Sequence, residues 1–381
     1  MTHLQEIYKN LQEQIEHLPL TDYSYVALDE KSRQEKMRNL IASKISFLPS
    51  EEQDRLTQEF FDLGPLSHLI ANEDITEIIV NGPQSIWFEQ KGLLHRHRDS
   101  FFSSLSFKNC IDLICLESQK QATLAQPCLD AHFREFRLSL VNDELTKTQT
   151  HFCLRRHPKN PWSFERLQKA GWCSSSQALT IQKLLNQRKN LLIVGGTGSG
   201  KTSVLNSCLQ ALPMNERLIV IEDTLEIALP NSASMRLLTR EDPQGTLPEV
   251  DQSLLVKRAL RLRPDRIVMG EIRGPESKDF LMALSSGHQG SLATLHADSP
   301  NQALLRLEML IQMGAPQWSL LAIRRLIQMS LDYIVVTQRT PEGARRLSGI
   351  YRLSSLEESG FLTEALEIEK DLTSSGQIFC V

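Results

Sequence analysis

The chain has 381 residues, enough for two or three domains with buried cores. Apolar residues make up 41% of it and charged residues 23%, which excludes a mainly disordered chain. The 42 Lys and Arg residues against 46 Asp and Glu residues give a formal charge of −4. That balance weighs against a protein that holds nucleic acid through bulk positive charge.

The compartment is also indicated by the sequence. The first residues, MTHLQEIYKNLQEQIEHLPL, interleave charged with apolar side chains, so they do not predict a signal peptide. No stretch approaches the roughly 18 consecutive apolar residues of a membrane span. The 7 cysteines are scattered and odd in number, which favours reduced thiols. We therefore expect a cytoplasmic protein without a membrane segment of its own.

The first half of the chain predicts three regions. Residues 1–70 show apolar positions at helical spacing and predict a helical N-terminal extension. Residues 71–156 predict an α+β domain, with a hairpin over 75–94, a helix over 105–118, and strands in REFRLSLV and THFCLRRH. Residues 157–177 contain two prolines, a glycine and a serine cluster, and predict a linker around a short helix.

Residues 178–381 show a different pattern, in which short apolar strands alternate with helical segments. The expected strands are NLLIVGG, RLIVIED, DRIVMGEIR and SLATLH. Such alternation indicates a mainly parallel sheet covered by helices, and therefore the α/β class. The last forty residues or so predict a small β-appendage to this domain.

A phosphate-binding loop is predicted at GGTGSGKT, which matches G-x-x-x-x-G-K-[ST] between an expected strand and an expected helix. The glycines let successive backbone N–H groups turn toward an anion, and the following helix adds its positive end. Lys201 is expected on the β- and γ-phosphates and Thr202 on Mg²⁺. The alternative is a glycine-rich turn that only joins strand to helix. The residues expected around the phosphates are Gly195, Gly196, Thr197, Gly198, Ser199, Gly200, Lys201, Thr202 and Ser203.

Two later strands are followed by carboxylates. RLIVIEDTLEI carries Glu222, Asp223 and Glu226, and RPDRIVMGEIRG carries Glu271 directly after Gly270, where many P-loop enzymes have an Asp. Glu271 can orient or polarise the attacking water, because phosphoryl transfer depends mostly on positioning and charge stabilisation. Glu222 or Glu226 can complete a Mg²⁺ shell through water. The alternative is that all are surface carboxylates at strand ends.

Histidines and arginines surround these strands. GHQGSLATLHAD carries His288 and His296, and His296 at the strand end is expected to sense the γ-phosphate or to pass on a conformational signal. A structural role is the alternative for both histidines. The run VKRALRLRPDR over 256–266 can be a nucleic-acid stripe, a solvated face or a subunit boundary. We favour the boundary, with cations offered to a neighbour's triphosphate, which implies a ring.

In this order the four blocks resemble the secretion-ATPase superfamily of type II, type IV and tight-adherence pilus systems, in particular the CpaF/TadA-type motors. They are similar to that family's Walker A, Asp box, Walker B and His box, and the resemblance covers about 75–355. It implies a RecA-like P-loop NTPase domain behind a smaller α+β domain. It also implies a homohexamer that uses ATP and Mg²⁺.

The resemblance further implies roles for single residues. Glu226 belongs to the Asp box and the metal shell, Glu271 is the catalytic glutamate, and His296 belongs to the His box. Arginines are expected to reach the γ-phosphate from other elements. The candidates are Arg155 in LRRH, Arg137 in PCLDAHFREFR with Arg134 as the alternative alignment, and Arg236 and Arg240 after the Asp box.

The sequence therefore predicts a cytoplasmic Mg²⁺-dependent ATPase ring. It would push on an inner-membrane pilus or secretion platform through an integral-membrane partner, with the helical extension as a docking or regulatory element. One alternative is a nucleic-acid translocase on the same core, which 6% aromatic residues and the charge of −4 disfavour. Another is a non-catalytic ATP-binding scaffold, which the presence of Lys201 and Glu271 disfavours.

Overall fold

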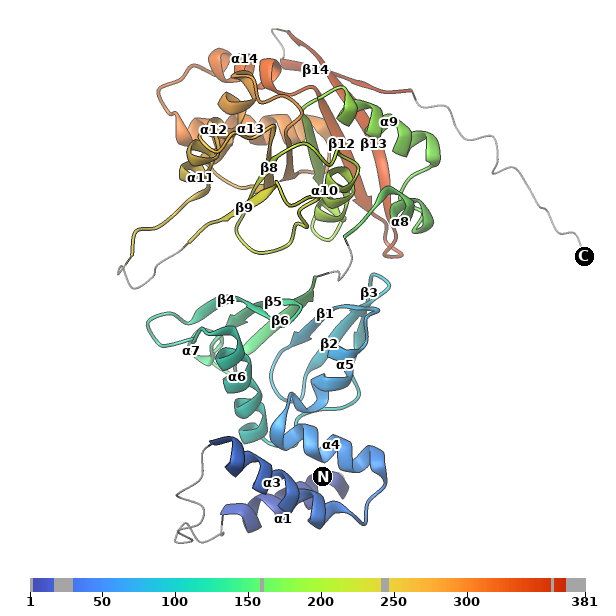
Figure 1. Ribbon diagram of the computed structural model, residues 1–381, viewed down its shortest axis with the longest axis vertical. Coiled ribbons are helices and arrows are strands. Elements are labelled where there is room, and N and C mark those ends of the chain that lie inside the picture. The colour runs from blue at the N-terminus through green and yellow to red at the C-terminus, as the bar shows by residue number, and fades with distance from the viewer. Residues whose placement is uncertain (1–2, 17–29, 158–160, 241–246, 358–359, 368–381) are drawn as a thin grey trace, which may run out of the picture. The chain divides into compact units, whose positions relative to one another are not determined.

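The computed structural model describes residues 3–16, 30–157, 161–240, 247–357 and 360–367, and divides into two compact units, Met1–His157 and Pro158–Val381 (Figure 1). Parts of the predicted extension (17–29), linker (158–160) and β-appendage (358–359 and 368–381) lie outside the described residues, as does Cys380. Among the helices that are described, none is both long enough and apolar enough to cross a membrane. The described cysteines are free thiols.

The described part of the first unit begins with the helices α1 (His3–Glu16), α3 (Glu30–Ile45) and α4 (Ser50–Phe61). They share a small apolar cluster that includes Tyr8, Ile41 and Leu56. A 3-10 turn, η1 (Gly64–Leu66), and α5 (Ser67–Ala71) lead into the sheet.

Helix α4 is fastened to the rest of the first unit by a buried ion-pair network. The Arg55 guanidinium contacts Glu59 at 2.6 Å and Asp99 at 2.5 Å. Glu59 in turn accepts hydrogen bonds from the Phe102 N–H and the Ser106 hydroxyl. Because breaking one partner of such a network leaves a buried charge without its partner, α4 is held as part of this unit.

An antiparallel sheet in the order β3-β2-β1-β6-β5-β4 forms the body of the first unit. Its inward face packs on α6 (Ser104–Ser118), where Phe107 and Ile114 meet Leu138 and Leu154. The short helix α7 (Asp143–Thr146) lies between β5 and β6. The strands are β1 (Ile75–Val80), β2 (Ile86–Gln90), β3 (Leu93–Arg96), β4 (Cys128–Phe133), β5 (Phe136–Val141) and β6 (His151–Arg156). Strand β4 was not predicted from the sequence.

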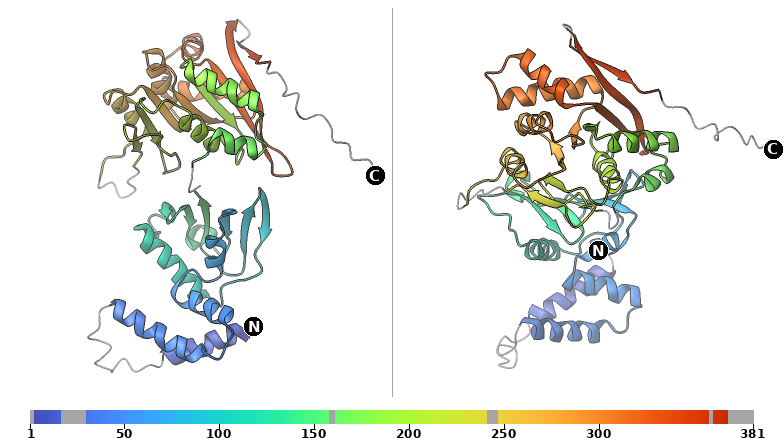
Figure 2. Two further views of the ribbon diagram at one scale, coloured as in Figure 1. Left: turned by 45° about the vertical axis from the view of Figure 1, so that its right-hand side comes forward. Right: turned by 45° about the horizontal axis from the view of Figure 1, so that its top comes forward.

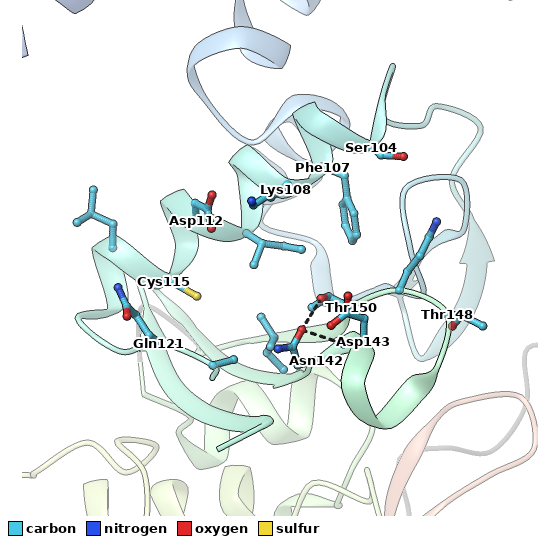
Figure 3. A pocket seen from close by; sticks show the side chains of 15 residues that line it. Ser104, Phe107, Lys108, Asp112, Cys115, Gln121, Asn142, Asp143, Thr148 and Thr150 are labelled. Atoms are coloured by element: carbon cyan, nitrogen blue, oxygen red, sulfur yellow. Dashed lines mark hydrogen bonds between the residues drawn. The ribbon is translucent and has the colours of Figure 1, made fainter. Parts of the chain in front are cut away.

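A cavity of about 720 Å³ opens in the first unit between α6 and the connection from β5 to β6 (Figure 3). Phe107, Ile111 and Leu140 contribute apolar surface to it. Its polar wall includes Asn142, whose side-chain oxygen accepts hydrogen bonds from the Asp143 N–H and the Thr150 hydroxyl. The lining residues differ from those that the sequence predicted as site residues.

The second unit is built on a sheet in the order β14-β13-β12-β7-β11-β10-β8-β9. The strands from β12 to β9 in this order are parallel, and β13 and β14 extend the sheet in antiparallel fashion. The strands are β7 (Leu191–Gly195), β8 (Leu218–Glu222), β9 (Met235–Leu238), β10 (Arg266–Ile272), β11 (Leu292–His296), β12 (Tyr333–Arg339), β13 (Arg345–Glu357) and β14 (Gly360–Ala365). The predicted α/β class with a mainly parallel sheet is confirmed.

Helices cover both faces of this sheet (Figure 2). Leu192 and Val194 of β7 face the layer of α11 to α14, whereas Leu191 and Ile193 face α8 to α10. A strand buried on both faces has no polar alternation, which is why its sequence is a continuous apolar run. The helices are α8 (Phe164–Lys169), α9 (Ser175–Asn186), α10 (Lys201–Gln210), α11 (Gln252–Ala259), α12 (Glu276–Ser285), α13 (Pro300–Gly314) and α14 (Leu320–Ser330).

The segment that was predicted as a linker around a short helix does contain one, α8, but where it is described it packs into the second unit. Residues 161–177 form α8 and the start of α9, and Phe164, Leu167 and Trp172 are buried in the second unit's core. Gly171 follows α8 with φ +72°, and serines cap these short helices. Ser163 and Ser174, for example, accept N–H groups at the two helix starts.

Candidate active site

The phosphate-binding motif forms the turn from β7 into α10. Gly198 and Gly200 have φ values of +70° and +93°, in the left-handed region that favours glycine. Gly195 is also required, because a Cβ there would collide with the Thr337 carbonyl. The first N–H groups of α10 and its positive dipole end face this turn, an arrangement that favours an anion there.

Lys201, the first residue of α10, is buried within the turn. Its ammonium donates to the carbonyls of Gly195 at 3.0 Å and Gly196 at 3.1 Å. It also lies 3.2 Å from Nδ1 of His296, at the end of β11. The single positive charge of the motif is thus placed between the turn and the neighbouring strand.

His296 connects Lys201 to Glu271. Its Nε2 lies 2.8 Å from Glu271 Oε1, at the end of β10. Since a carboxylate only accepts, Nε2 carries the proton and Nδ1 accepts from Lys201. Burial lowers the pKa of His296, and the charge of Lys201 lowers it further, against the opposing effect of Glu271. The imidazole is therefore neutral at pH 7 and bridges a cation to a carboxylate.

The charged contacts continue beyond Glu271 through Arg273, which the sequence analysis did not single out. Its guanidinium lies 2.5 Å from Glu271 Oε2 and 3.6 Å from Asp223. Asp223 also accepts hydrogen bonds from Thr239 at 3.0 Å and Gln252 at 2.8 Å. Cations and carboxylates thus alternate along the ends of the parallel strands, from Lys201 in the turn to Asp223 after β8.

Glu226 lies in the segment after β8, next to the start of α10. Asn206 joins the two, because its side-chain nitrogen lies 3.1 Å from the Thr202 carbonyl and 3.3 Å from the Glu226 carbonyl. Glu222, the alternative metal ligand, is buried and accepts the N–H groups of Glu226 and Ile227. Burial raises the pKa of Glu222, although these hydrogen bonds and Arg236 oppose the shift.

Strands β12 and β13 brace the phosphate-binding turn from outside. The Thr337 hydroxyl accepts from the Trp172 indole at 2.9 Å and donates to the Ser199 carbonyl at 2.9 Å. Arg345 Nε donates to the Gly198 carbonyl at 2.8 Å. Sequence motifs gave no signal for these residues, because Thr337 lies 165 positions from Trp172 and 138 from Ser199.

Two predicted arginines meet in the first unit. Arg137 of β5 and Arg155 of β6 are paired in register, so both side chains project from the outer face of the sheet. Arg134, the alternative to Arg137, sits in the turn before β5 with φ +50° and contacts Glu117 at 2.8 Å and Asp62 at 3.4 Å. The register therefore favours Arg137 as the partner of Arg155.

The candidates that follow the Asp box are engaged within the second unit. Arg236 lies 2.5 Å from Glu222 Oε1 and also contacts the Ile227 carbonyl. Arg240 donates to the Pro248 carbonyl at 2.8 Å, and its backbone forms an isolated antiparallel β-bridge with Val250. Within the described residues, Arg236 therefore has a role in holding the segment after β8.

The basic run over 256–266 is not one continuous surface. Arg266 is 1% exposed and contacts Glu216 at 2.5 Å, the Gly290 carbonyl at 2.9 Å and the Leu185 carbonyl at 3.0 Å. This arginine is therefore structural, contrary to its place in the predicted boundary. His288 lies 3.1 Å from the Ala283 carbonyl, which fits its structural alternative.

Comparison with known proteins places this arrangement in context. The family model described as "Type II/IV secretion system protein" matches residues 130–349. A putative conjugal transfer protein of Mycobacterium tuberculosis is 29% identical over 309 residues, which cover 79% of this chain and 87% of that protein. The type IV secretion system protein PtlH of Bordetella pertussis is 29% identical over 330 residues, which cover 77% and 94%.

A solved structure shares the fold. The X-ray structure of the ATPase DotB of Legionella pneumophila matches with a TM-score of 0.57 and 19% identity, over 76% of this chain and 80% of that one. The likeness extends the match from the sequence to the architecture of strands and helices described above.

Proposed function

Because this chain belongs to the family of type II/IV secretion system proteins, we propose that it is a Mg²⁺-dependent ATPase that works as a homohexameric ring. The ring powers protein secretion or the assembly of a tight-adherence-type pilus, from the cytoplasmic side of an inner-membrane platform. The observation that carries the proposal is the chain of contacts from Lys201 through His296 to Glu271. It joins a phosphate-binding cation to a carboxylate suited to handling water.

Residues 195–203 would hold the phosphates of ATP. The backbone N–H groups of the turn and of the start of α10 supply the donors, and Lys201 supplies a point charge for the β- and γ-phosphates. Lys201 needs no large movement from its present carbonyl partners to contact an anion in the turn. Removing this charge should therefore weaken binding and catalysis together.

Thr202 and Glu226 would hold Mg²⁺, the latter partly through water. The donor set fits, because hydroxyl and carboxylate oxygens are ligands that Mg²⁺ prefers, and Asn206 holds both residues as neighbours. When bound, the ion neutralises charge that develops on the transferred phosphate.

Glu271 would orient the attacking water and accept its proton. The His296 Nε2–H and the Arg273 guanidinium each donate to one oxygen of its carboxylate, so the group is fixed in one orientation. A positioned base of this kind contributes about 10²–10⁴-fold to a rate. Because the same imidazole accepts from Lys201, a shift of the ammonium on phosphate binding reaches Glu271 through one side chain.

Arginines outside the phosphate-binding turn would complete the site in the ring. Arg137 and Arg155 of the first unit, and Arg240 of the second, are the residues we assign to the γ-phosphate. Charge-assisted hydrogen bonds from guanidinium to phosphate are strong and directional. Their simultaneous loss on hydrolysis would release the arginines and drive a change of conformation.

The test is the steady-state ATPase rate of the full chain against protein concentration, with the mass measured at each point. We expect the specific rate to rise as hexamers form, and a Lys201→Ala sample to stay at background. A rate from monomers that does not depend on concentration would contradict the shared site. It would leave a P-loop hydrolase that acts alone.

A further inference from the structure

The segment after β8 is held in an unusual way. Residues 226–228 belong to no helix or strand, yet each of their six backbone polar groups contacts a side chain. The N–H groups of Glu226 and Ile227 donate to Glu222 Oε2 at 2.9 and 3.1 Å, and the N–H of Ala228 donates to Asn206 Oδ1 at 2.8 Å. The three carbonyls accept from Asn206 at 3.3 Å, from Arg236, and from Gln210 at 3.3 Å.

This arrangement makes the segment rigid although it is irregular. Backbone polar groups that are buried need partners, and a group that loses its partner costs about 1–3 kcal/mol. Asn206 is 3% exposed and Glu222 is 3% exposed, so water cannot readily replace either of them. The position of Glu226 is therefore set by a few side chains from α10, β8 and β9.

Among these side chains, Asn206 contacts both the start of α10 and the segment. Its nitrogen donates both to the Thr202 carbonyl, one turn back on α10, and to the Glu226 carbonyl. One amide thereby links Thr202, the second residue of the phosphate-binding helix, to the residue that carries the second oxygen donor. Its own oxygen accepts from Ala228, so the amide cannot rotate without losing contacts on both sides.

The β8 side of the segment is held by Glu222 and Arg236, whose charged atoms lie 2.5 Å apart. Glu222 has room there because the adjacent residue on β10 is Gly270, where a Cβ would lie 3.0 Å from the Cβ of Glu222. Many P-loop enzymes carry an acidic side chain at the position of Gly270. Here the glycine leaves space for Glu222, whose carboxylate anchors the segment. The segment after β8 therefore has to supply the carboxylate for a metal.

We propose that Asn206 is a positioning residue for Mg²⁺, which fixes Glu226 relative to Thr202, with the Glu222–Arg236 pair as the second anchor. The proposal rests on the proposed function, since it assumes that the metal binds at Thr202 and Glu226. Mg²⁺ requires near-octahedral geometry with short distances to oxygen. A small displacement of Glu226 therefore weakens the binding of Mg²⁺ more than it weakens the binding of the nucleotide itself.

The experiment measures the affinity of a fluorescent ADP analogue, N-methylanthraniloyl-ADP, for the full chain in Mg²⁺ and in EDTA. The wild type should bind more tightly in Mg²⁺. Asn206→Ala should reduce the ratio of the two affinities by about 10-fold, as do losses of outer-shell partners in metal sites, and leave the affinity in EDTA unchanged. Gln210→Ala, which removes only the contact to the Ala228 carbonyl, is the matched control and should keep the wild-type ratio.

A second variant protects the test against a failure to fold. In Asn206→Ser the hydroxyl can still donate to the carbonyl four residues back on α10, but it is too short to reach the segment. It should show the same reduced ratio as Asn206→Ala. An unchanged ratio in both variants, or an equal loss of affinity in Mg²⁺ and EDTA, would overturn the proposal. A wild type that binds equally well in Mg²⁺ and EDTA would instead contradict the metal assignment of the proposed function.

Discussion

The phosphate-binding edge of the second unit and the outer sheet face of the first unit use charge in opposite ways. At the edge, Lys201, His296, Glu271 and Arg273 contact one another in a chain, so cations and carboxylates are matched within the unit. On the outer face, Arg137 and Arg155 are cross-strand neighbours of the same charge. Like charges in facing positions are unfavourable by themselves. Arg155 also faces Glu77 of β1 on its other side, so the charge of this face is compensated in part. We propose that the edge holds and processes an anion and that the outer face offers its arginines to one.

The largest effect should come from removing the cation at the edge, Lys201. Lys201→Ala should lower the ATPase rate by at least about 100-fold, because this buried ammonium is the positive charge that we assign to the phosphates. Nucleotide binding, measured by fluorescence titration, should weaken as well.

The matched control is Lys189→Ala, which removes a half-buried ion pair to Asp332 just before the start of β7, at the end opposite the phosphate-binding turn. It should leave both the rate and the affinity within about 2-fold of wild type, since the pair lies away from the turn. An equal loss in the two variants would mean that Lys201 has no special role.

The outer face can be tested with two arginines that lie close in sequence. Arg137→Ala should lower kcat by about 10–100-fold, the effect of losing one or two charge-assisted hydrogen bonds to phosphate. Arg134→Ala breaks the contacts to Glu117 and Asp62, so it should cost less than about 1 kcal/mol of stability and keep kcat. If kcat falls only in the Arg134 variant, the register argument is wrong.

The bracing of the edge predicts a smaller effect. Thr337→Val leaves the Trp172 indole N–H and the Ser199 carbonyl without their buried partner, so the free energy of unfolding of the second unit should fall by about 1–3 kcal/mol. Thermal or urea unfolding would measure it. Thr337→Ser keeps the hydroxyl and should lose only about 1 kcal/mol from the missing methyl group. Equal losses would show that packing, and not the hydrogen bonds, supports the turn.

The smallest expected effect is on pH dependence. Burial and Lys201 lower the pKa of His296, whereas an unfolded histidine titrates near about 6.5. Below that pH the unfolded chain binds a proton that the folded imidazole does not, so the free energy of unfolding should fall as the pH falls. The ring is 34% exposed, which limits the size of the effect.

Urea unfolding at about pH 7.5 and about pH 5.5 would measure this difference. His296→Gln should show a shallower loss of stability over the same interval. Identical losses in wild type and variant would assign the pH dependence to other groups.

Sequence reasoning located the edge because its residues lie in contiguous motifs. A P-loop between a strand and a helix places Lys201 and Thr202, and the ends of parallel strands place Glu271 and His296 on one side of the sheet. Since β11 lies between β7 and β10, the structure brings these side chains into contact. The same reasoning gave the α/β class and the strands β7, β8, β10 and β11. It missed β9, and it assigned β12 to an appendage although β12 pairs in parallel with β7 inside the sheet.

What sequence reasoning missed depends on contacts between distant positions. The brace of Trp172, Thr337 and Ser199 requires β12 to lie beside β7, which no local pattern specifies. The burial of Arg266 and the pairing of Arg236 with Glu222 follow from strand pairing between β8 and its neighbours. Both arginines look like surface charges in a linear reading, because their partners come from other elements.

The central claim, that the edge of the second unit hydrolyses ATP through Glu271, is tested most directly by one paired measurement. Fluorescent-nucleotide affinity and phosphate release are measured on the full chain for wild type and Glu271→Gln. We predict that the variant keeps the affinity within about 3-fold and loses about 100-fold or more in the rate of phosphate release. A variant that releases phosphate at the wild-type rate would contradict the account.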